Sequence, residues 1–359
     1  MKWQVADYRL QIGCHSERTR RILLFTVYCL LFTVFSSCGN GESDQLPVAT
    51  NDSTTPADIR AINEKIKNDR GDVDLYFQRA KAYFANNDYP NAVNDMKIAL
   101  NFDSTKANYY IFLSDLYFSH NQTRATRDML RKAIALDSAN SEALMKYSQL
   151  FYLLKQYDTA TIFINRSIHF NNSSATAHFQ KGMILKEWGD TVKSISSFQT
   201  AVEFNQQYYD AYMQLGLLHS AKKKSVALGF FDNALNIDPK SMEARYGKGK
   251  FFQDIEEYEN SLKEYNSILN ISPENQEVTF NIGGIFFVQK KYNEALQKYE
   301  ETVKRDANFF RGYYGRGRCY EALGEINKAK EEYKRCLAVN PQFELAAIQL
   351  DALDRKGKK

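Results

Sequence analysis

Residues 313–341 read YYGRGRCYEALGEINKAKEEYKRCLAVNP, and the pattern of this stretch recurs along most of the chain. A small residue stands at Gly317, and equivalent small residues precede it at intervals of 34 residues, with one interval of 33. This column consists of Ala80, Ser114, Ser148, Gly182, Gly216, Gly249, Gly283 and Gly317. A fixed period of this length is typical of a stacked solenoid, so the sequence predicts a repeat architecture.

Each repeat contains two stretches with the apolar spacing of an α-helix. In the first repeat Tyr76, Ala80 and Tyr83 follow one another at i, i+4 and i+7, and the stretch from Ala92 to Ala99 keeps the same spacing. The polar residues 86–88 between them predict a turn. Each repeat is therefore expected to be a helix–turn–helix, with small residues where the two backbones approach closely.

Local signals predict where the helices begin and end. Pro239, Pro273 and Pro341 are expected to end the second helices of their repeats, and an Asp or Ser of Asp103-Ser104 and of Asp137-Ser138 is expected to cap the helix that follows. The single short interval predicts a one-residue deletion in the turn around 222–224, because a deletion inside a helix would rotate its apolar face by about 100°.

The columns resemble the tetratricopeptide repeat, most fully in the last repeat. The residues that carry the resemblance there are Tyr313, Gly317, Tyr320, Ala329, Tyr333, Cys336 and Pro341. The resemblance implies an all-α fold, a right-handed α-solenoid of about eight helix–turn–helix repeats over 73–341. Such a stack needs capped ends. A half-repeat helix is expected over 57–72, and a capping helix with a basic tail over 342–359.

The N-terminus resembles a bacterial lipoprotein signal. Arginines at 18, 20 and 21 precede an uncharged stretch, 22–35, which is too short to span a membrane but suits a signal peptide. Ser36-Ser37-Cys38 then resembles a lipobox. This resemblance implies a signal peptide over 1–37, a lipidated Cys38, and a polar tether over 38–56, with the protein anchored in a bacterial cell envelope, in the outer membrane. A secreted protein or a signal anchor with an incidental Cys38 stays open as the alternative.

Charge and composition narrow the class of partner. The chain holds 47 basic and 43 acidic residues; residues 1–37 hold five basic and two acidic ones, so 42 and 41 remain after processing. This balance argues against nucleic-acid binding, which requires a basic face. The sequence predicts no cofactor and no metal site, because its histidines and cysteines lack ligand spacing. The chain is therefore expected not to be an enzyme.

A few chemically notable residues have structural explanations. Cys319 and Cys336 lie on the two helices of one repeat, so they are either a disulfide or, as favoured here, two buried free thiols. The carboxylate pairs Glu256-Glu257 and Glu331-Glu332 are expected to be solvated. His219 stands in an aromatic column, which predicts a packed structural histidine.

One face of the first helices carries the candidate binding site. Its first column (Phe77, Ile111, Met145, Phe179) is apolar and continues so in later repeats, and its second column (Phe84, Phe118, Tyr152) is aromatic in the first three repeats. Exposed apolar columns usually mark a binding surface, although the first column could equally pack against the neighbouring helix. Polar contacts are expected from Gln78, Lys81, Asp115, Gln149 and Gln180. In related proteins this stripe lines a concave groove for peptides or helices.

Three functional classes follow from these observations. The leading one is a membrane-anchored scaffold that binds an extended peptide or an amphipathic helix of a partner protein, in envelope assembly, secretion or remodelling. The alternative is an outer-membrane lipoprotein that captures a glycan or nutrient, although this chain lacks the long insertions on which such sites sit. An enzyme on an unfamiliar helical site is the third class. The oligomeric state is left open.

Overall fold

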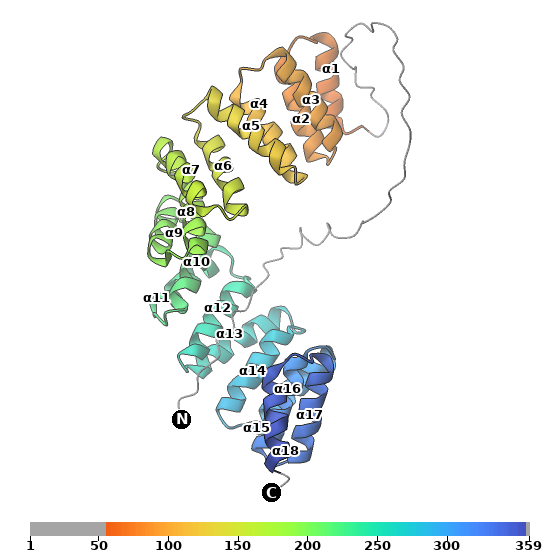
Figure 1. Ribbon diagram of the computed structural model, residues 1–359, viewed down its shortest axis with the longest axis vertical. Helices are drawn as coiled ribbons and strands as arrows, with labels where there is room; N and C mark the ends of the chain where they lie inside the picture. The colour runs from red at the N-terminus through yellow and green to blue at the C-terminus, as the bar shows by residue number, and fades with distance from the viewer. Residues whose placement is uncertain (1–54, 357–359) are drawn as a thin grey trace. The chain divides into compact units, whose positions relative to one another are not determined.

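The computed structural model describes residues 55–356, which belong to one compact unit, Asn51–Lys359. The predicted signal peptide, Cys38 and most of the tether lie outside the described residues, as does the end of the basic tail. The described part of the chain is helical with no strand, and its eighteen helices follow one another as packed neighbours (Figure 1). This confirms the predicted all-α solenoid.

The helices form eight pairs flanked by one helix at each end. Within each pair, from α2/α3 to α16/α17, the two helices make the most extensive contacts. Their bounds are α1 (Ala57–Asn68), α2 (Val73–Ala85), α3 (Tyr89–Phe102), α4 (Ala107–Ser119), α5 (Thr123–Leu136), α6 (Ser141–Leu153), α7 (Tyr157–Phe170), α8 (Ala175–Trp188), α9 (Thr191–Phe204), α10 (Tyr209–Ser220), α11 (Val226–Ile237), α12 (Met242–Asp254), α13 (Tyr258–Ile271), α14 (Gln276–Val288), α15 (Tyr292–Arg305), α16 (Phe310–Ala322), α17 (Ile326–Val339) and α18 (Glu344–Lys356). Each pair is one repeat, with an even-numbered first helix and an odd-numbered second helix.

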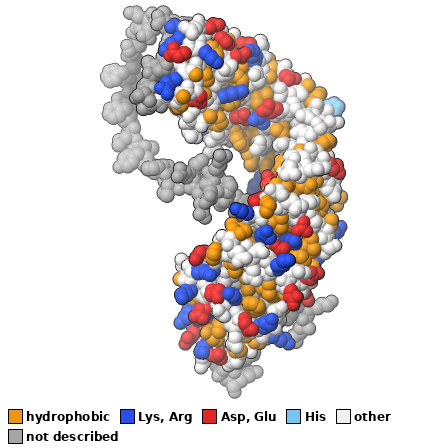
Figure 2. All heavy atoms as spheres, turned by 180° about the vertical axis from the view of Figure 1, so that it is seen from behind, with side chains coloured by type: hydrophobic (Ala, Val, Ile, Leu, Met, Phe, Trp, Pro, Cys, Tyr) orange, Lys and Arg blue, Asp and Glu red, His pale blue; other side chains and the backbone are white. Residues whose placement is uncertain are grey.

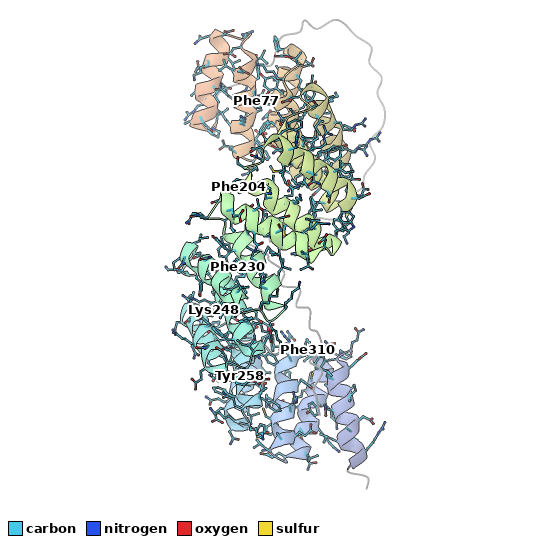
Figure 3. All side chains as sticks on the ribbon, turned by 90° about the vertical axis from the view of Figure 1, so that its left-hand side faces the viewer. Phe77, Phe204, Phe230, Lys248, Tyr258 and Phe310 are labelled. Atoms are coloured by element: carbon cyan, nitrogen blue, oxygen red, sulfur yellow. The ribbon has the colours of Figure 1, made fainter. Side chains whose placement is uncertain are left out.

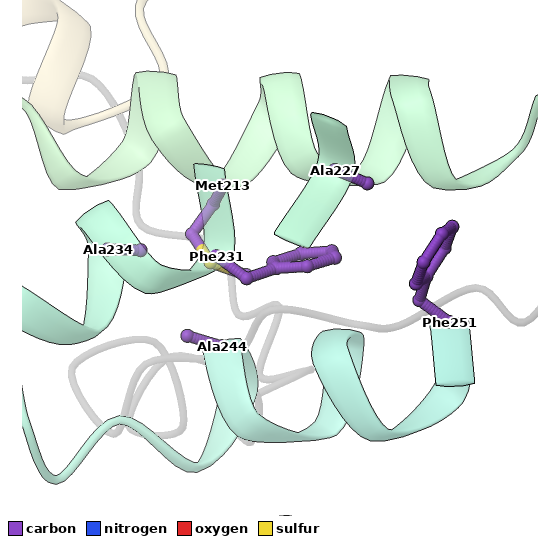
Figure 4. Packing of buried hydrophobic residues seen from close by; sticks show 6 residues of the cluster. All are labelled: Met213, Ala227, Phe231, Ala234, Ala244 and Phe251. Atoms are coloured by element: carbon purple, nitrogen blue, oxygen red, sulfur yellow. The ribbon is translucent and has the colours of Figure 1, made fainter. Parts of the chain in front are cut away.

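The small-residue column lets an aromatic ring of the second helix lie against the first helix. In the fifth repeat the buried ring of Phe231 lies 2.6 Å from the positions that Cβ atoms would take on Gly216 and on Gly247 of the next repeat. Figure 4 shows this ring among Met213, Ala234 and Ala244, between the helices of two repeats. The ring, which belongs to α11, therefore packs against the first helix of its own repeat, α10, and against the first helix of the next repeat, α12.

A second pair of equivalent positions, one on each helix of a repeat, changes its chemistry from repeat to repeat. Arg79 and Asp95, both at most 3% exposed, form a two-point ion pair with N–O distances of 2.7 and 2.8 Å. The successive pairs are Arg79/Asp95, Leu113/Met129, Tyr147/Phe163, Lys181/Ser197, Leu215/Phe230, Lys248/Glu264, Ile282/Lys298 and Arg316/Glu332. Ion pairs link Lys248 to Glu264 and Arg316 to Glu332, each at 3.2 Å. In each repeat that has an acidic residue at the second-helix position, the first-helix position holds a basic residue.

The turn inside each repeat has one backbone conformation throughout the stack. Eight equivalent residues have positive φ: Asn87, Asn121, Lys155, Gly189, Lys223, Glu256, Lys290 and Gly324. The turn predicted over 86–88 is confirmed, with Asp88 accepting a hydrogen bond from the Asn91 backbone as an N-cap. The predicted deletion lies between Lys223 and Ala227, four residues apart where the other repeats have five, so it falls in the turn and at the start of α11.

Two of the local predictions have different outcomes. The second helices α11, α13 and α17 end two residues before Pro239, Pro273 and Pro341, as predicted. The N-cap prediction at Asp103-Ser104 and Asp137-Ser138 is wrong: the two aspartates end the preceding helices, and Lys106 and Asn140 are the N-cap residues of α4 and α6. Each carboxylate accepts a backbone hydrogen bond from the residue two positions on, which closes a turn in the linker, and the next helix starts later.

The end helices cover the apolar ends of the stack. On α1, Ile59 and Ile66 are buried and Ile62 is half-buried. On α18, Leu353 is 2% exposed and packs with Tyr333 and Cys336 of the last repeat. Asn63 of α1 also accepts a hydrogen bond of 2.9 Å from the Arg79 guanidinium, so α1 joins the first repeat by a polar contact as well.

Two predictions about the last repeat also have opposite outcomes. Cys319 and Cys336 are free and buried, which confirms the favoured alternative. The expectation that Glu332 is solvated is wrong: it is 3% exposed and lies between Arg316 and Arg335. Burial raises the pKa of Glu332, against the two guanidinium groups.

Candidate partner-binding face

The candidate site lies on the first helices, whose equivalent residues recur every 34 positions apart from the one interval of 33. Successive first helices touch one another at α6/α8, α10/α12 and α14/α16, in addition to packing on their own second helices. We call the surface made by the two predicted columns the first-helix face. Phe77, at its start on α2, is labelled in Figure 3.

The first column mainly packs between neighbouring repeats. The ring of Phe77 lies 4.9 Å from the ring of Tyr109 and 5.6 Å from that of Phe112, both on α4. Ile111 is 5% exposed. Phe179 and Met145 are half-buried, with Phe179 4.9 Å from Tyr208 at the start of α10. The packing alternative therefore holds for much of this column, and little of Ile111 is open to a partner.

The second column is more open, and Phe118 is its most exposed member. Phe118 is 39% exposed at the end of α4. Phe84 is half-buried against the edge of the Phe112 ring at 6.0 Å, and Tyr152 is half-buried 6.2 Å from Tyr157. Burial raises the pKa of Tyr152, so its hydroxyl stays protonated and can donate a hydrogen bond. The two flanking rings hold their positions through packing, and the ring of Phe118 is available.

The polar residues expected on this face divide into two groups. Asp115 pairs with Lys146 of the next repeat at 2.7 Å, and the Gln180 side chain donates to the Met145 carbonyl at 3.1 Å. Burial raises the pKa of Asp115, partly offset by Lys146. These two residues join repeats. The other group, Gln78, Lys81 and Gln149, is exposed.

Lys81 sits on an aromatic ring. Its ammonium lies 4.1 Å from the centre of the Phe77 ring, within the range of a cation–π contact. This contact holds a positive charge beside the aromatic columns, where it can meet a carboxylate of a partner. Lys81 and Phe77 thus form one unit of the candidate site.

The same face becomes polar in the later repeats. The ammonium of Lys186 donates to Gln214 at 3.0 Å, and the Asn281 amide donates to the Tyr246 hydroxyl at 3.1 Å. The guanidinium of Arg318 lies 4.3 Å from the centre of the Phe287 ring. In the later repeats these side chains are therefore engaged in contacts between repeats. The accessible apolar part of the first-helix face lies in the first three repeats.

Sequence reasoning missed Phe112 and a set of residues at the ends of the first helices. Phe112 lies between Phe77 and Phe84 and fixes both rings, although it stands outside the two columns. Leu153, Leu154 and Trp188 are 54%, 45% and 52% exposed. These residues stand one or two positions after the second column. The residues at those positions are polar or small in the first two repeats, so the change to large apolar residues could have indicated them.

The described residues, 55–356, contain neither a metal-ligand cluster nor a membrane-spanning helix. No three histidine, cysteine or acidic side chains in this range come together as metal ligands. None of the described helices combines the length and apolar character that crossing a bilayer requires. On the face drawn in Figure 2, hydrophobic, basic and acidic side chains are interspersed.

Comparisons with known proteins agree with this architecture. The profile of the tetratricopeptide repeat matches residues 175–208 and 310–343. Over 149 residues the chain is 26% identical to the BBSome complex member BBS4 of Bos taurus; the match covers 40% of this chain and 27% of that protein, about a quarter of its length.

Two solved structures share the fold at a TM-score of 0.51. One is a tetratricopeptide repeat protein from Parabacteroides merdae, 18% identical, over 69% of this chain and 98% of that one. The other is PilF of Pseudomonas aeruginosa, 16% identical, over 58% of this chain and 94% of that one. The chain therefore carries tetratricopeptide repeats.

Proposed function

We propose that this chain, built of tetratricopeptide repeats, is a non-enzymatic scaffold that binds a partner protein on the first-helix face of its first three or four repeats. The observation that carries the proposal is the exposed ring of Phe118, which continues the column of Phe84 and Tyr152. An exposed aromatic side chain with packed aromatic neighbours is a typical anchor point, because little conformational entropy is lost when it is covered.

The chemistry of this face favours a short extended peptide or one face of an amphipathic helix. Phe84, Phe118 and Tyr152 recur once per repeat, so an apolar ligand side chain can contact each in turn. Lys81 offers a positive charge at one end, and Gln78 and Gln149 offer amide donors and acceptors beside the rings. We expect a ligand with two or three apolar side chains and an acidic group near the first repeat.

We further propose that the scaffold is anchored by a lipid on Cys38, in a bacterial outer membrane. The support is the sequence of residues 18–38, with its arginines, its uncharged stretch and its Ser-Ser-Cys end. Anchoring would confine the chain to one surface and raise the local concentration of whatever it binds. Cys38→Ser should abolish incorporation of radiolabelled palmitate and move the protein out of the membrane fraction; unchanged labelling would contradict the anchor.

Site-specific photo-crosslinking in intact cells tests the binding face. Probes replace Phe84 and Phe118, and a control probe replaces Lys132, which is exposed on α5. The proposal expects one discrete protein captured from the two face positions and absent from the Lys132 probe. Equal capture from all three positions would mean that the columns serve packing alone.

A matched substitution separates binding from stability. Phe118→Ser should weaken binding of the captured partner in a purified assay, since it removes the exposed ring while leaving Phe84 and Tyr152 in place. Ile162→Ser is the control, because Ile162 is 59% exposed on the second helix α7, outside this face. Equal loss of binding in both variants would assign the effect to general surface changes rather than to the face.

A further inference from the structure

The turns inside the third, fourth and fifth repeats expose large apolar side chains. Val192 is 73% exposed, Leu153 54%, Trp188 52%, Val226 49% and Leu154 45%. They lie at the ends of first helices or the starts of second helices, on segments 153–156, 188–193 and 221–226. We call these three segments the turn edge.

Turns of neighbouring repeats lie next to one another. The ring of Tyr89, in the first turn, stacks on that of His120, in the second. Farther along, the ammonium of Lys223 donates to the backbone carbonyl of Asp254 in the next turn, at 2.9 Å. Because the repeats share one turn conformation, we expect the three segments of the turn edge to lie at the same end of their helix pairs.

The turn edge is also basic. Its three segments contain five lysines, Lys155, Lys193, Lys222, Lys223 and Lys224, and a single acidic residue, Asp190. Asp190 is neutralised by Lys193 at 2.9 Å. The adjoining Glu187 lies 3.6 Å from Lys186. Each of the three segments therefore carries both apolar and positively charged side chains.

The opposite edge provides an internal comparison. At the ends of the second helices, Phe102, Leu136, Phe170 and Phe204 are 46–49% exposed, one in each of four successive repeats. Phe102 stacks on Tyr76 and Phe204 on His178, and the residues that follow the four are Asp or Asn. Apolar residues there belong to the repeat architecture. Those of the turn edge vary between repeats: Ala85 and Ser119 stand where the third repeat has Leu153, and the exposed Val288 takes the same position in the seventh repeat.

We infer that the turn edge rests on an anionic lipid surface. Its tryptophan and aliphatic side chains would enter the interfacial layer, and its lysines would lie over the negatively charged headgroups. Tryptophan favours this layer because one end of its ring is apolar and the other donates a hydrogen bond, and basic residues near an anionic leaflet are attracted to it. The inference rests on the proposed membrane anchor and concerns a surface other than the first-helix face.

A lipid surface fits the turn edge better than an acidic protein does. The apolar side chains protrude from the tips of separate turns, so they can enter a soft layer independently. The lysines come from three successive repeats and match a surface of uniform negative charge. A protein partner would have to place complementary pockets at three consecutive tips.

The chain offers a spectroscopic reporter for this inference, because its two tryptophans are Trp3 and Trp188. In the full chain with Trp3→Phe, Trp188 emission reports on the turn edge alone. Vesicles of phosphatidylcholine containing phosphatidylglycerol should shift this emission to the blue, and brominated lipids should quench it. Raising salt from about 0.1 M to about 1 M should weaken the shift, since the Debye length falls from about 10 to about 3 Å.

Unshifted Trp188 emission in a chain that floats with the vesicles would overturn the inference, since the N-terminus alone would then hold the lipid. The control reporter is Trp3→Phe/Trp188→Phe/Phe204→Trp, which places the sole tryptophan on the opposite edge near Phe204 (Figure 3). Its emission should not shift. An equal shift of both reporters would also contradict the turn edge as the contact.

Substitutions complete the test. Leu153→Ser/Leu154→Ser/Val192→Ser should reduce the Trp188 shift, whereas Ile162→Ser/Ile348→Ser, both 59% exposed elsewhere, should leave it unchanged. Far-UV circular dichroism checks that each variant is folded. A shift that survives the triple substitution, or that needs an added acidic protein instead of lipid, would overturn the inference. Crosslinking from Phe118 is read separately, so either proposal can fail without the other.

Discussion

The ring of Phe198 lies 2.6 Å from the position that a Cβ atom would take on Gly182, closer than real Cβ contacts come. The same complementarity runs through the stack. In the last five repeats the small column is glycine and the facing residue is a ring: Phe198, Phe231, Tyr265, Tyr299 or Tyr333. In the first three repeats Ala80, Ser114 and Ser148 take the place of the glycine. The residues in the place of the ring there are Met96, Leu130 and Ile164. Each small residue is thus matched to the width of its partner.

Gly182→Ala should destabilise the protein. Overpacking a core costs about 1–3 kcal/mol, and with the ring this close we expect it to outweigh the roughly 1 kcal/mol that alanine gains over glycine inside a helix. Adding Phe198→Met recreates the Ala80/Met96 pair of the first repeat. Urea unfolding of both single variants and the double variant should then give a favourable coupling of at least about 1 kcal/mol. Additive effects would contradict the matched-width explanation.

Asp95→Met should destabilise the first repeat by about 3–5 kcal/mol, because it leaves the buried guanidinium of Arg79 without its carboxylate. Arg79→Leu/Asp95→Met copies the Leu113/Met129 pair of the second repeat and should recover most of that loss. Hydrogen exchange of the α2 and α3 amides measures both effects. A double variant as unstable as the single one would mean that the ion pair itself, and not the unpaired charge, governs stability here.

Lys290→Gly should stabilise the protein. Lys290 has a φ of 62°, a conformation that costs an L-residue about 1–2 kcal/mol and glycine almost nothing. Part of this gain is offset because glycine loses more conformational entropy on folding than lysine does. The net gain should be roughly 0.5–1 kcal/mol, measured as a rise in the urea midpoint. Lys304→Gly, inside α15, is the matched control and should lower the midpoint.

His219 should make stability depend on pH. Both of its ring nitrogens are buried without a hydrogen-bond partner, and its ring stacks on Phe230 at 5.3 Å. Burial lowers the pKa of His219 below its usual 6.5, helped by Lys224 and Lys222. The unfolded chain therefore binds a proton more readily, so this contribution to stability is present above pH 6.5 and is lost as the pH falls through the folded pKa.

The substitution His219→Tyr should remove this part of the pH dependence, and tyrosine already occupies equivalent positions such as Tyr83 and Tyr117. The check is urea unfolding between about pH 7 and pH 5. His169→Tyr serves as the control, because the exposed ring of His169 loses less water on folding. The same slope before and after His219→Tyr would show that other groups produce it.

Cys319 and Cys336 should resist alkylation in the folded protein. Both are fully buried, and burial raises the pKa of Cys319 to about 12 and that of Cys336 to about 11. Iodoacetamide at about pH 8 should add no mass at these residues until urea is present, and then should label both. Failure to label in urea without a reductant would instead indicate a disulfide.

Much of the fold followed from the sequence because the signals were periodic. Eight copies of one pattern located the helix pairs. Pro239 and Pro273 predicted helix ends correctly because a proline ends a helix through local backbone geometry, without help from distant contacts. Capping was harder, since the carboxylate of Asp103 can close a linker turn or start a helix, and the choice depends on where the linker ends. Glu332 was misjudged because its partner, Arg316, comes from another helix.

The candidate site was predicted only as a set of positions. The sequence located the columns, yet the exposure of Phe118 and the packing of Ile111 depend on the neighbouring repeat. Asp115 looked like a contact for a ligand and is paired with Lys146 instead. The turn edge lay outside the columns and so was missed, although Leu153, Leu154 and Trp188 stand out against the small or polar residues of the first two repeats.

The changing pairs between the helices of each repeat bear on how such a chain avoids misassembly. Eight similar units could in principle exchange second helices during folding. If α2 took α5 in place of α3, Arg79 would meet Met129 and Asp95 would lose its base, and both buried charges would be stranded. The reverse exchange would set Leu113 against a carboxylate. A repeat with a buried ion pair thus differs from its neighbour with an apolar pair, and this difference favours pairing of the correct helices even where the ion pair is no more stabilising than an apolar pair would be.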